Sequence, residues 1–258
     1  MRNHFHYVSA LSEAKGMDKT MIKTFPGILT DIFYPRRCPV CDRAVRPFGG
    51  LICETCTSKF VYVKQPCCLK CGKELAEETE EYCGDCLRRR HLFDCGRALY
   101  VYKSVSDSIY RFKYRGRQEY GAYYASCMKK QLGGWIAQRR PDALIPVPIH
   151  AAKRRTRGYD QAQVLARELG RRMGIPVEDQ LVKRVRRTVP MKDLPLAERQ
   201  NNLKRAFKIC RNDVKLDTVI IIDDIYTTGS TIDAMSYELR RAGVKRIYFV
   251  TLAVGNGI

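Results

Sequence analysis

Eight cysteines between residues 38 and 86 are arranged in four CxxC pairs, and their spacing constrains what this part of the chain can fold into. Two pairs lie eleven residues apart, and the same arrangement recurs thirty residues later, which gives the set Cys38, Cys41, Cys53, Cys56, Cys68, Cys71, Cys83 and Cys86. Within one CxxC pair both thiolates can turn toward a single ion, and two pairs complete a tetrahedral shell of four sulfurs. The repeat therefore predicts structural zinc.

The spacing leaves the sharing of the cysteines between ions open. Two zinc ribbons, each built from four consecutive cysteines, are the simplest interpretation, and a cross-braced arrangement of alternate pairs is the alternative, with one or two ions bound. Either arrangement is a closed site without an open position for catalysis. Because about fifty residues bury little apolar surface, we expect the metal to supply much of the folding free energy of this module.

Composition divides the chain into three parts. We expect a leader over residues 1–37 with one short helix over Met21–Tyr34, a zinc-binding double-ribbon module over residues 38–95, and an α/β domain over residues 96–258. No apolar run approaches the roughly 18 residues that span a membrane, and residues 1–37 lack the apolar centre of a secretory signal. We therefore expect a cytoplasmic protein without membrane insertion.

Positive charge is concentrated in the C-terminal part of the chain. Residues 1–95 carry 15 basic and 12 acidic side chains, whereas residues 96–258 carry 32 basic and 15 acidic ones. A field of this sign favours polyanions or phosphorylated ligands, and binding through it weakens as salt is added. A solvated basic surface without a specific partner is the alternative interpretation.

From about residue 96 the hydrophobic pattern alternates between strands and helices. We expect strands over Arg97–Tyr102, Ala143–Ile149, Leu181–Val185, Asp217–Asp223 and Ile247–Ala253. We expect helices over Glu119–Gln138, Tyr159–Met173 and Thr231–Arg241. The run DTVIIID is almost continuously apolar, as in a parallel strand that is buried on both faces. This alternation predicts an open α/β sheet.

The candidate site follows the strand Asp217–Asp223. Asp223 and Asp224 stand at the strand end, and the residues Thr227, Thr228, Gly229, Ser230 and Thr231 lead into a helix. Ligands of open α/β sheets bind beyond the carboxyl ends of the strands, and backbone N–H groups at a helix start favour an anion. Carboxylates instead suit the hydroxyls of a ribose. A helix with an ordinary N-cap is the alternative interpretation.

The stretch Val219–Thr231, VIIIDDIYTTGST, resembles the motif with which type I phosphoribosyltransferases bind phosphoribosyl pyrophosphate (PRPP). Three further segments resemble the ComF family of competence-associated, phosphoribosyltransferase-like proteins: Ile109–Arg117 (IYRFKYRGR), Ile145–Ala166 (IPVPIHAAKRRTRGYDQAQVLA) and Leu194–Phe207 (LPLAERQNNLKRAF). The cysteine module is similar to the zinc ribbon of that family. Asp160 and Met191 depart from the family pattern, which usually has Asn and Gln there, and both departures bear on how an acceptor is recognised.

The resemblance implies a fold and a set of roles. The fold is an α/β, type I phosphoribosyltransferase-like open, mostly parallel sheet, preceded by a small cysteine-rich zinc-ribbon module. Asp223 and Asp224 would hold the ribose 2′- and 3′-hydroxyls, and Thr227–Thr231 would wrap the 5′-phosphate. Val147 and Pro148 would approach the pyrophosphate, bridged by Mg²⁺. Arg157, with its neighbours Arg154 and Arg155, would neutralise the leaving pyrophosphate, although a plain basic surface turn is the alternative.

Two hypotheses of function follow. The first is an enzyme that transfers 5-phosphoribosyl from PRPP to an unidentified acceptor and releases pyrophosphate, with a hood of residues 97–117 and 181–207 around the acceptor. The second is an accessory protein of DNA uptake in natural transformation, which binds single-stranded DNA through its basic surface; the resemblance also implies a helicase-like competence protein as a partner. Stacking platforms for DNA bases would come from Tyr100, Tyr102, Tyr110, Tyr114, Tyr120, Tyr123 and Tyr124.

Overall fold

The computed structural model describes residues 35–46, 49–185, 206–211 and 215–255. The helix expected over Met21–Tyr34, the residue Met191 and nearly all of the segment Leu194–Phe207 lie outside the described residues.

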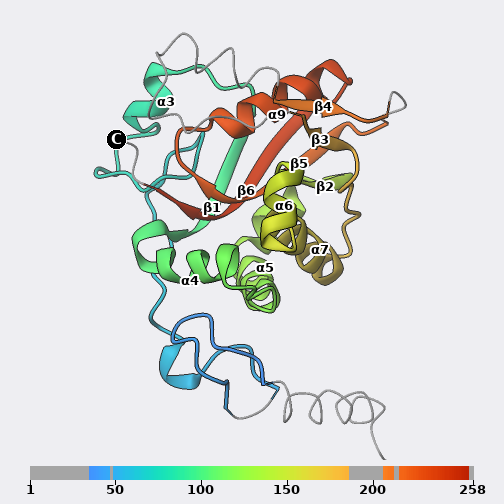
Figure 1. Ribbon diagram of the computed structural model, residues 1–258. Helices are drawn as coiled ribbons and strands as arrows, with labels where there is room; N and C mark the ends of the chain where they lie inside the picture. Colours follow the sequence, from blue (N-terminus) through green and yellow to red (C-terminus); the bar gives the residue numbers. More distant parts are fainter. Residues whose placement is uncertain (1–34, 47–48, 186–205, 212–214, 256–258) are drawn as a thin grey trace, which may run out of the picture.

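Four parallel strands form the central sheet, in the order β1-β6-β5-β2 (Figure 1). Their bounds are β1 (Cys95–Val101), β2 (Ala143–Pro146), β5 (Thr218–Tyr226) and β6 (Arg246–Val254). Strand β5 pairs with β2 on one side and with β6 on the other. It is therefore a central strand, and its residues Thr218 to Ile222 are all buried, as its apolar run predicts.

Helices cover both faces of the sheet. Helices α4 (Tyr102–Tyr114), α5 (Tyr120–Gln138) and α7 (Gln161–Met173) share one hydrophobic core with Ile220 and Ile222 of β5. Helix α9 (Ser230–Arg241) shares the core of the opposite face with Val219 and Ile221. Alternate residues of β5 thus face different layers, and the result is a three-layer α/β domain (Figure 1).

Several boundaries differ from those that the sequence predicts. Tyr102, expected to end the first strand, instead begins α4, a helix that the pattern did not predict because most of its residues are polar. Strand β2 ends at Pro146, and a short helix α6 (Ala151–Arg157) follows it. Strand β3 (Val182–Arg184) pairs antiparallel with β4 (Phe207–Ile209) in a separate two-stranded sheet.

The cysteine-rich segment contacts the α/β domain at two separate places. The first ribbon, residues 35–60, contains the short helix η2 (Glu54–Cys56) and lies against α4 and α5. The second ribbon, residues 67–88, contains α3 (Gly84–Arg88) and lies near β1 and α9 (Figure 1). Within the described part of the chain, no helix is both long enough and apolar enough to cross a bilayer.

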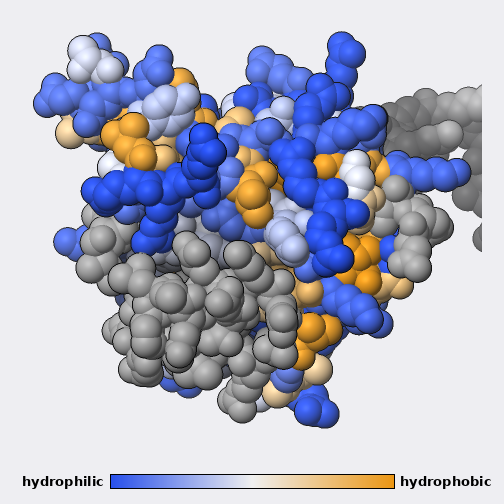
Figure 2. Space-filling model, turned by 90° about the horizontal axis from the view of Figure 1, so that it is seen from above, coloured by the Kyte–Doolittle hydropathy of each residue, from blue (hydrophilic) through white to orange (hydrophobic). Residues whose placement is uncertain are grey.

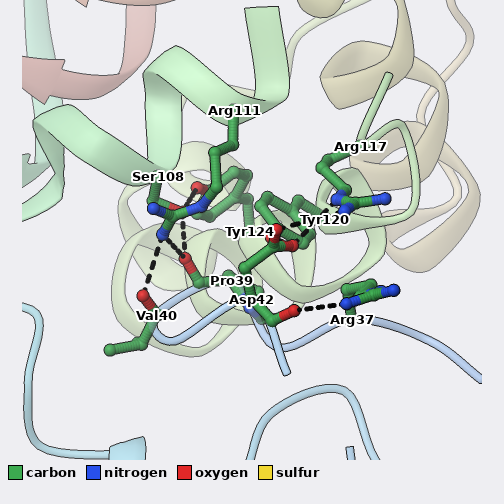
Figure 3. A network of polar contacts seen from close by, with 9 residues as sticks. All are labelled: Arg37, Pro39, Val40, Asp42, Ser108, Arg111, Arg117, Tyr120 and Tyr124. Atoms are coloured by element: carbon green, nitrogen blue, oxygen red, sulfur yellow. Dashed lines mark hydrogen bonds and ion pairs between the residues drawn. The ribbon is translucent and has the colours of Figure 1, made fainter. Parts of the chain in front are cut away.

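A polar network attaches the first ribbon to the domain (Figure 3). The Asp42 carboxylate accepts hydrogen bonds from Arg117 Nε at 2.8 Å and from Tyr120 Oη at 2.6 Å. Arg111 donates to the carbonyl oxygens of Pro39 and Val40. Burial alone would raise the pKa of Asp42, but the bonds from Arg117 and Tyr120 outweigh it and hold this pKa below its ordinary value.

Candidate active site

Two groups of four cysteine sulfurs have the geometry of zinc sites. Within each group all ligand atoms lie within 4.8 Å of one another, and the groups consist of consecutive cysteines: Cys38, Cys41, Cys53 and Cys56 in the first ribbon, and Cys68, Cys71, Cys83 and Cys86 in the second. Sγ–Sγ distances of 3.9 and 3.6 Å match the roughly 3.8 Å between sulfurs that bind tetrahedral zinc at about 2.3 Å. The donor sets therefore fit structural zinc, and the cross-braced alternative is wrong.

A pair of carboxylates lies near the carboxyl end of β5. Asp223 and Asp224 are both half-buried, and the strand continues past them to Tyr226, so they are part of the strand rather than its end. Burial raises the pKa of Asp223 well above its ordinary value, and repulsion from the adjacent Asp224 adds to that effect. Carboxyl groups with shifted pKa values cluster at functional sites, where burial and like charges are brought together.

Lys113 of α4 reaches this pair from the neighbouring layer. Its Nζ lies 2.7 Å from Asp224 Oδ2, and both side chains are only 17% exposed. Burial alone would lower the pKa of Lys113, but attraction to Asp224 and Asp223 outweighs burial, so the pKa is raised. Lys113 is therefore a cation that partly balances the two carboxylates, and the charge of Arg184 also interacts with Asp223.

The segment after β5 turns through a glycine into helix α9. Gly229 is buried with φ +77°, in the left-handed region, and it precedes the first residue of α9. The hydroxyl oxygens of Thr228 and Ser230 lie 2.9 Å apart. Thr227 is exposed, and Thr231 lies in the first turn of the helix. The segment that the sequence predicts to bind phosphate thus includes the start of α9, and free N–H groups at a helix start favour an anion.

The residues that follow β2 lie beside the carboxylates. Val147 N donates to the carbonyl oxygen of Ile222, which directly precedes Asp223, and Pro148 is the next residue. The buried Asp160 holds this segment, because it accepts a hydrogen bond from Ile149 N at 2.9 Å while it caps the start of α7. Asp160 therefore holds the segment after β2 against the start of α7.

Helix α6 carries the arginines expected to face pyrophosphate. Arg157 donates to Gln161 Oε1 and to Tyr114 Oη, both at 2.9 Å, and its guanidinium lies 4.6 Å from the centre of the Tyr114 ring. It is also near enough to Lys113 to oppose the protonation of that lysine. Arg154 and Arg155 are exposed. The α6 N-cap is His150, whose Nδ1 accepts a hydrogen bond from Ala152 N.

Two side chains at the site carry no signal that identifies them in the sequence. Lys113 lies within the segment Ile109–Arg117, which resembles a family motif, but its contact with Asp224 joins positions more than a hundred residues apart. His91, which shows no pairing in the sequence, lies against Gly229 and forms a 2.8 Å contact with Asp233. Each contact depends on the tertiary fold, so local patterns do not reveal it.

The tyrosines named as stacking platforms separate into two groups. Tyr100, Tyr120, Tyr123 and Tyr124 are buried core residues, so they cannot stack on a ligand base. Tyr102, Tyr110 and Tyr114 are exposed on α4.

Comparison with known proteins agrees with this architecture. The family model of a double zinc ribbon domain matches residues 29–87, and that of a phosphoribosyl transferase domain matches residues 156–257. The predicted fold class, a phosphoribosyltransferase-like parallel sheet preceded by a zinc-ribbon module, is thereby confirmed.

Three curated relatives extend the similarity over most of the chain. Competence protein F of Haemophilus influenzae is 31% identical over 233 residues, which cover 86% of this chain and 98% of that protein. DNA utilization protein YhgH of Escherichia coli K12 is 26% identical over 221 residues, covering 83% and 94% of the two chains. Competence protein ComFC of Bacillus subtilis is 25% identical over 194 residues, covering 70% and 74%. The chain therefore belongs to the ComF family of competence-associated, phosphoribosyltransferase-like proteins.

Proposed function

We propose that this protein binds PRPP at the carboxyl end of β5 and transfers its 5-phosphoribosyl group to an acceptor, with release of pyrophosphate. The observation that carries the proposal is the combination of two adjacent carboxylates with a glycine-containing helix start. Asp223 and Asp224 would accept hydrogen bonds from the ribose 2′- and 3′-hydroxyls. Thr227–Thr231 would hold the 5′-phosphate through hydroxyls and backbone N–H groups.

Transfer breaks the bond between C1 of the ribose and the pyrophosphate oxygen. Pyrophosphate leaves with the electron pair of that bond, and a lone pair of the acceptor forms the new bond to C1. The departing anion gains charge as the ribose gains oxocarbenium character, so cationic groups nearby lower the barrier. Val147 and Pro148 would lie along the pyrophosphate, and Arg157 would supply positive charge from α6.

Magnesium is the cofactor that this reaction needs. Bound with PRPP, Mg²⁺ would neutralise oxygens of the pyrophosphate and polarise the bond that breaks. Carboxylate oxygens are the protein ligands that Mg²⁺ prefers, and it commonly binds through one or two of them together with substrate phosphates. Asp223 and Asp224 are the carboxylates available for this contact.

Release of pyrophosphate from PRPP tests the transferase activity. The zinc-loaded protein is incubated with PRPP and Mg²⁺, alone and with single-stranded DNA or a small-molecule cell extract as the source of acceptor. We expect acceptor-dependent release that Asp223→Asn/Asp224→Asn abolishes. Asp217→Asn is the matched control, because Asp217 is an exposed carboxylate just before the opposite end of the same strand. PRPP binding without release under every condition would contradict the transferase activity.

A second candidate function is binding of single-stranded DNA in DNA uptake. The names of the relatives point to competence and DNA utilization, and residues 96–258 carry 32 basic and 15 acidic side chains. On the face shown in Figure 2, hydrophilic groups surround small separate hydrophobic patches. Tyr110 and Tyr114 are both more than half exposed, with ring centres 5.1 Å apart.

These two tyrosines give the DNA hypothesis a direct test. Stacking on aromatic rings contributes about 1–3 kcal/mol per base, so Tyr110→Ala/Tyr114→Ala should weaken binding of a labelled oligothymidine at least about fivefold. Tyr237→Ala, an exposed tyrosine on α9, is the control. Unchanged affinity in the double variant would contradict stacking on α4. The DNA-uptake hypothesis also includes a cytoplasmic location and a helicase-like competence protein as partner.

A further inference from the structure

The second zinc ribbon packs directly onto the α/β domain. Its buried Cys68 and Cys71 belong to the same hydrophobic cluster as Tyr226 of β5 and Phe249 of β6. A Cβ atom added at Gly72 would lie 2.9 Å from the carbonyl oxygen of Gly96 in β1. This ribbon is therefore continuous with the core beneath α9.

Aromatic rings connect this ribbon to the end of β5. Phe93, which follows the ribbon, is 1% exposed and makes edge contacts with Tyr226 and Phe249 at 6.2 and 4.9 Å between ring centres. Tyr226 and Phe249 stack nearly parallel at 4.8 Å. Because Tyr226 directly precedes Thr227, the ring cluster fixes the point where the predicted phosphate-binding segment begins.

His91 contacts the other end of that segment. Its side chain is 2% exposed and stacks on Phe93 at 4.7 Å, and its Nδ1 lies 2.8 Å from Asp233 Oδ2 in the first turn of α9. The Nε2 atom is buried without a hydrogen-bond partner among the described residues, so Asp233 is the polar group that orients the ring. Leu92 N donates to the other carboxylate oxygen of Asp233 at 2.8 Å.

The imidazole also lies against the glycine of the segment. A Cβ atom added at Gly229 would lie 2.9 Å from His91 Cε1 and 2.7 Å from Tyr226 Oη. The left-handed backbone at Gly229 is thus enclosed between Tyr226 and the histidine that follows the second ribbon. A change in the position of His91 would therefore alter the space in which Thr227–Ser230 is held.

We propose that the second zinc ribbon is a structural part of the phosphate-binding site, with His91 as the positioning residue that holds Thr227–Ser230 through Asp233 and Gly229. The inference rests on the proposed function for the identity of the ligand, a 5′-phosphate. The first ribbon serves for comparison, because the polar contacts seen among its described residues, centred on Asp42, are with α4 and α5 and not with Thr227–Ser230. The two ribbons therefore contact different parts of the domain although their cysteine spacing is identical.

Hydrogen exchange of the full-length, zinc-loaded protein without ligand tests the positioning directly. In His91→Ala we expect faster amide exchange in the peptide that contains Thr227–Ser230, and Asp233→Ala should reproduce the effect. His91→Asn should restore part of the protection, because its amide nitrogen can donate to Asp233 from the place of Nδ1. Asp42→Asn, which weakens the attachment of the first ribbon, should leave this peptide unchanged even if it lowers the melting temperature.

PRPP affinity is measured by calorimetry on the same four variants. We expect His91→Ala and Asp233→Ala to bind about tenfold more weakly, since a charge-assisted hydrogen bond that preorganises the segment is lost, and Asp42→Asn to bind as the wild type does. Unchanged exchange and affinity in both His91→Ala and Asp233→Ala would overturn the inference. If the wild type bound no PRPP while His91→Ala still exchanged faster, the proposed function would fail and the positioning role of His91 would stand.

Discussion

Replacing Lys113 by Met would remove the cation that pairs with Asp224 on β5. Lys113 Nζ is 2.7 Å from Asp224 Oδ2, and each side chain is 17% exposed. At an effective dielectric constant of about 20, the attraction across that distance is about 6 kcal/mol. Desolvation of the two charges offsets part of it, and breaking a buried pair from one side costs about 3–5 kcal/mol. Residual exposure favours the lower end, so we expect a loss of about 3 kcal/mol.

Thermal unfolding of the zinc-saturated protein measures this loss. For a chain of this size, about 3 kcal/mol corresponds to a fall of roughly 6–12 °C in the melting temperature. Lys113→Met/Asp224→Asn should recover most of the loss, because the buried carboxylate is then neutral and needs no cation. A single variant that melts within about 2 °C of the wild type, or a double variant as unstable as the single one, would refute the reasoning.

Three further predictions concern the carboxylates, the loop glycine and the metal. Asp223→Asn should raise the melting temperature at pH 7. The pKa of Asp223 is raised in the folded state, so ionisation of this side chain destabilises the fold as the pH rises above its unfolded-state pKa of about 3.9. The difference from the wild type should therefore shrink as the pH is lowered from 8 to 5; a constant difference would contradict the shift. Gly229→Ala should cost about 1–3 kcal/mol in urea unfolding, because it combines φ +77° with a Cβ atom 2.7 Å from Tyr226 Oη; wild-type stability would contradict the enclosed glycine. Cys41→Ser and Cys71→Ser should each reduce the zinc content from two ions to one by elemental analysis, and loss of both ions in either variant would contradict independent sites.

Much of the fold follows from local patterns in the sequence. The apolar run Val219–Ile222 specifies a central strand because both of its faces are buried. The repeated CxxC spacing predicts structural zinc because each pair of ligands lies within four residues, whereas the division of the cysteines into two consecutive groups of four follows from the fold. Helix α4 was not predicted because most of its residues are polar. Its apolar residues Val105, Ile109 and Phe112 are buried on one side only.

The candidate site was only partly predictable for a related reason. The segment Asp223–Thr231 carries its signal within nine residues, so its position at the end of β5 follows once the strand is recognised. Lys113 and His91 reach that segment from parts of the chain more than a hundred residues away, and only the packing of α4 and of the second ribbon brings them there. Contacts between residues so far apart in the chain produce no local pattern in a single sequence, so they could not be predicted from it.

Calorimetric titration of the zinc-loaded protein with PRPP in the presence of Mg²⁺ tests the central claim most directly. The account predicts saturable one-to-one binding that Asp223→Ala/Asp224→Ala abolishes and that Asp217→Asn, at the opposite end of β5, leaves intact. The absence of any binding by the folded wild-type protein, or equal binding by the double variant, would contradict a PRPP site at the carboxyl end of this strand.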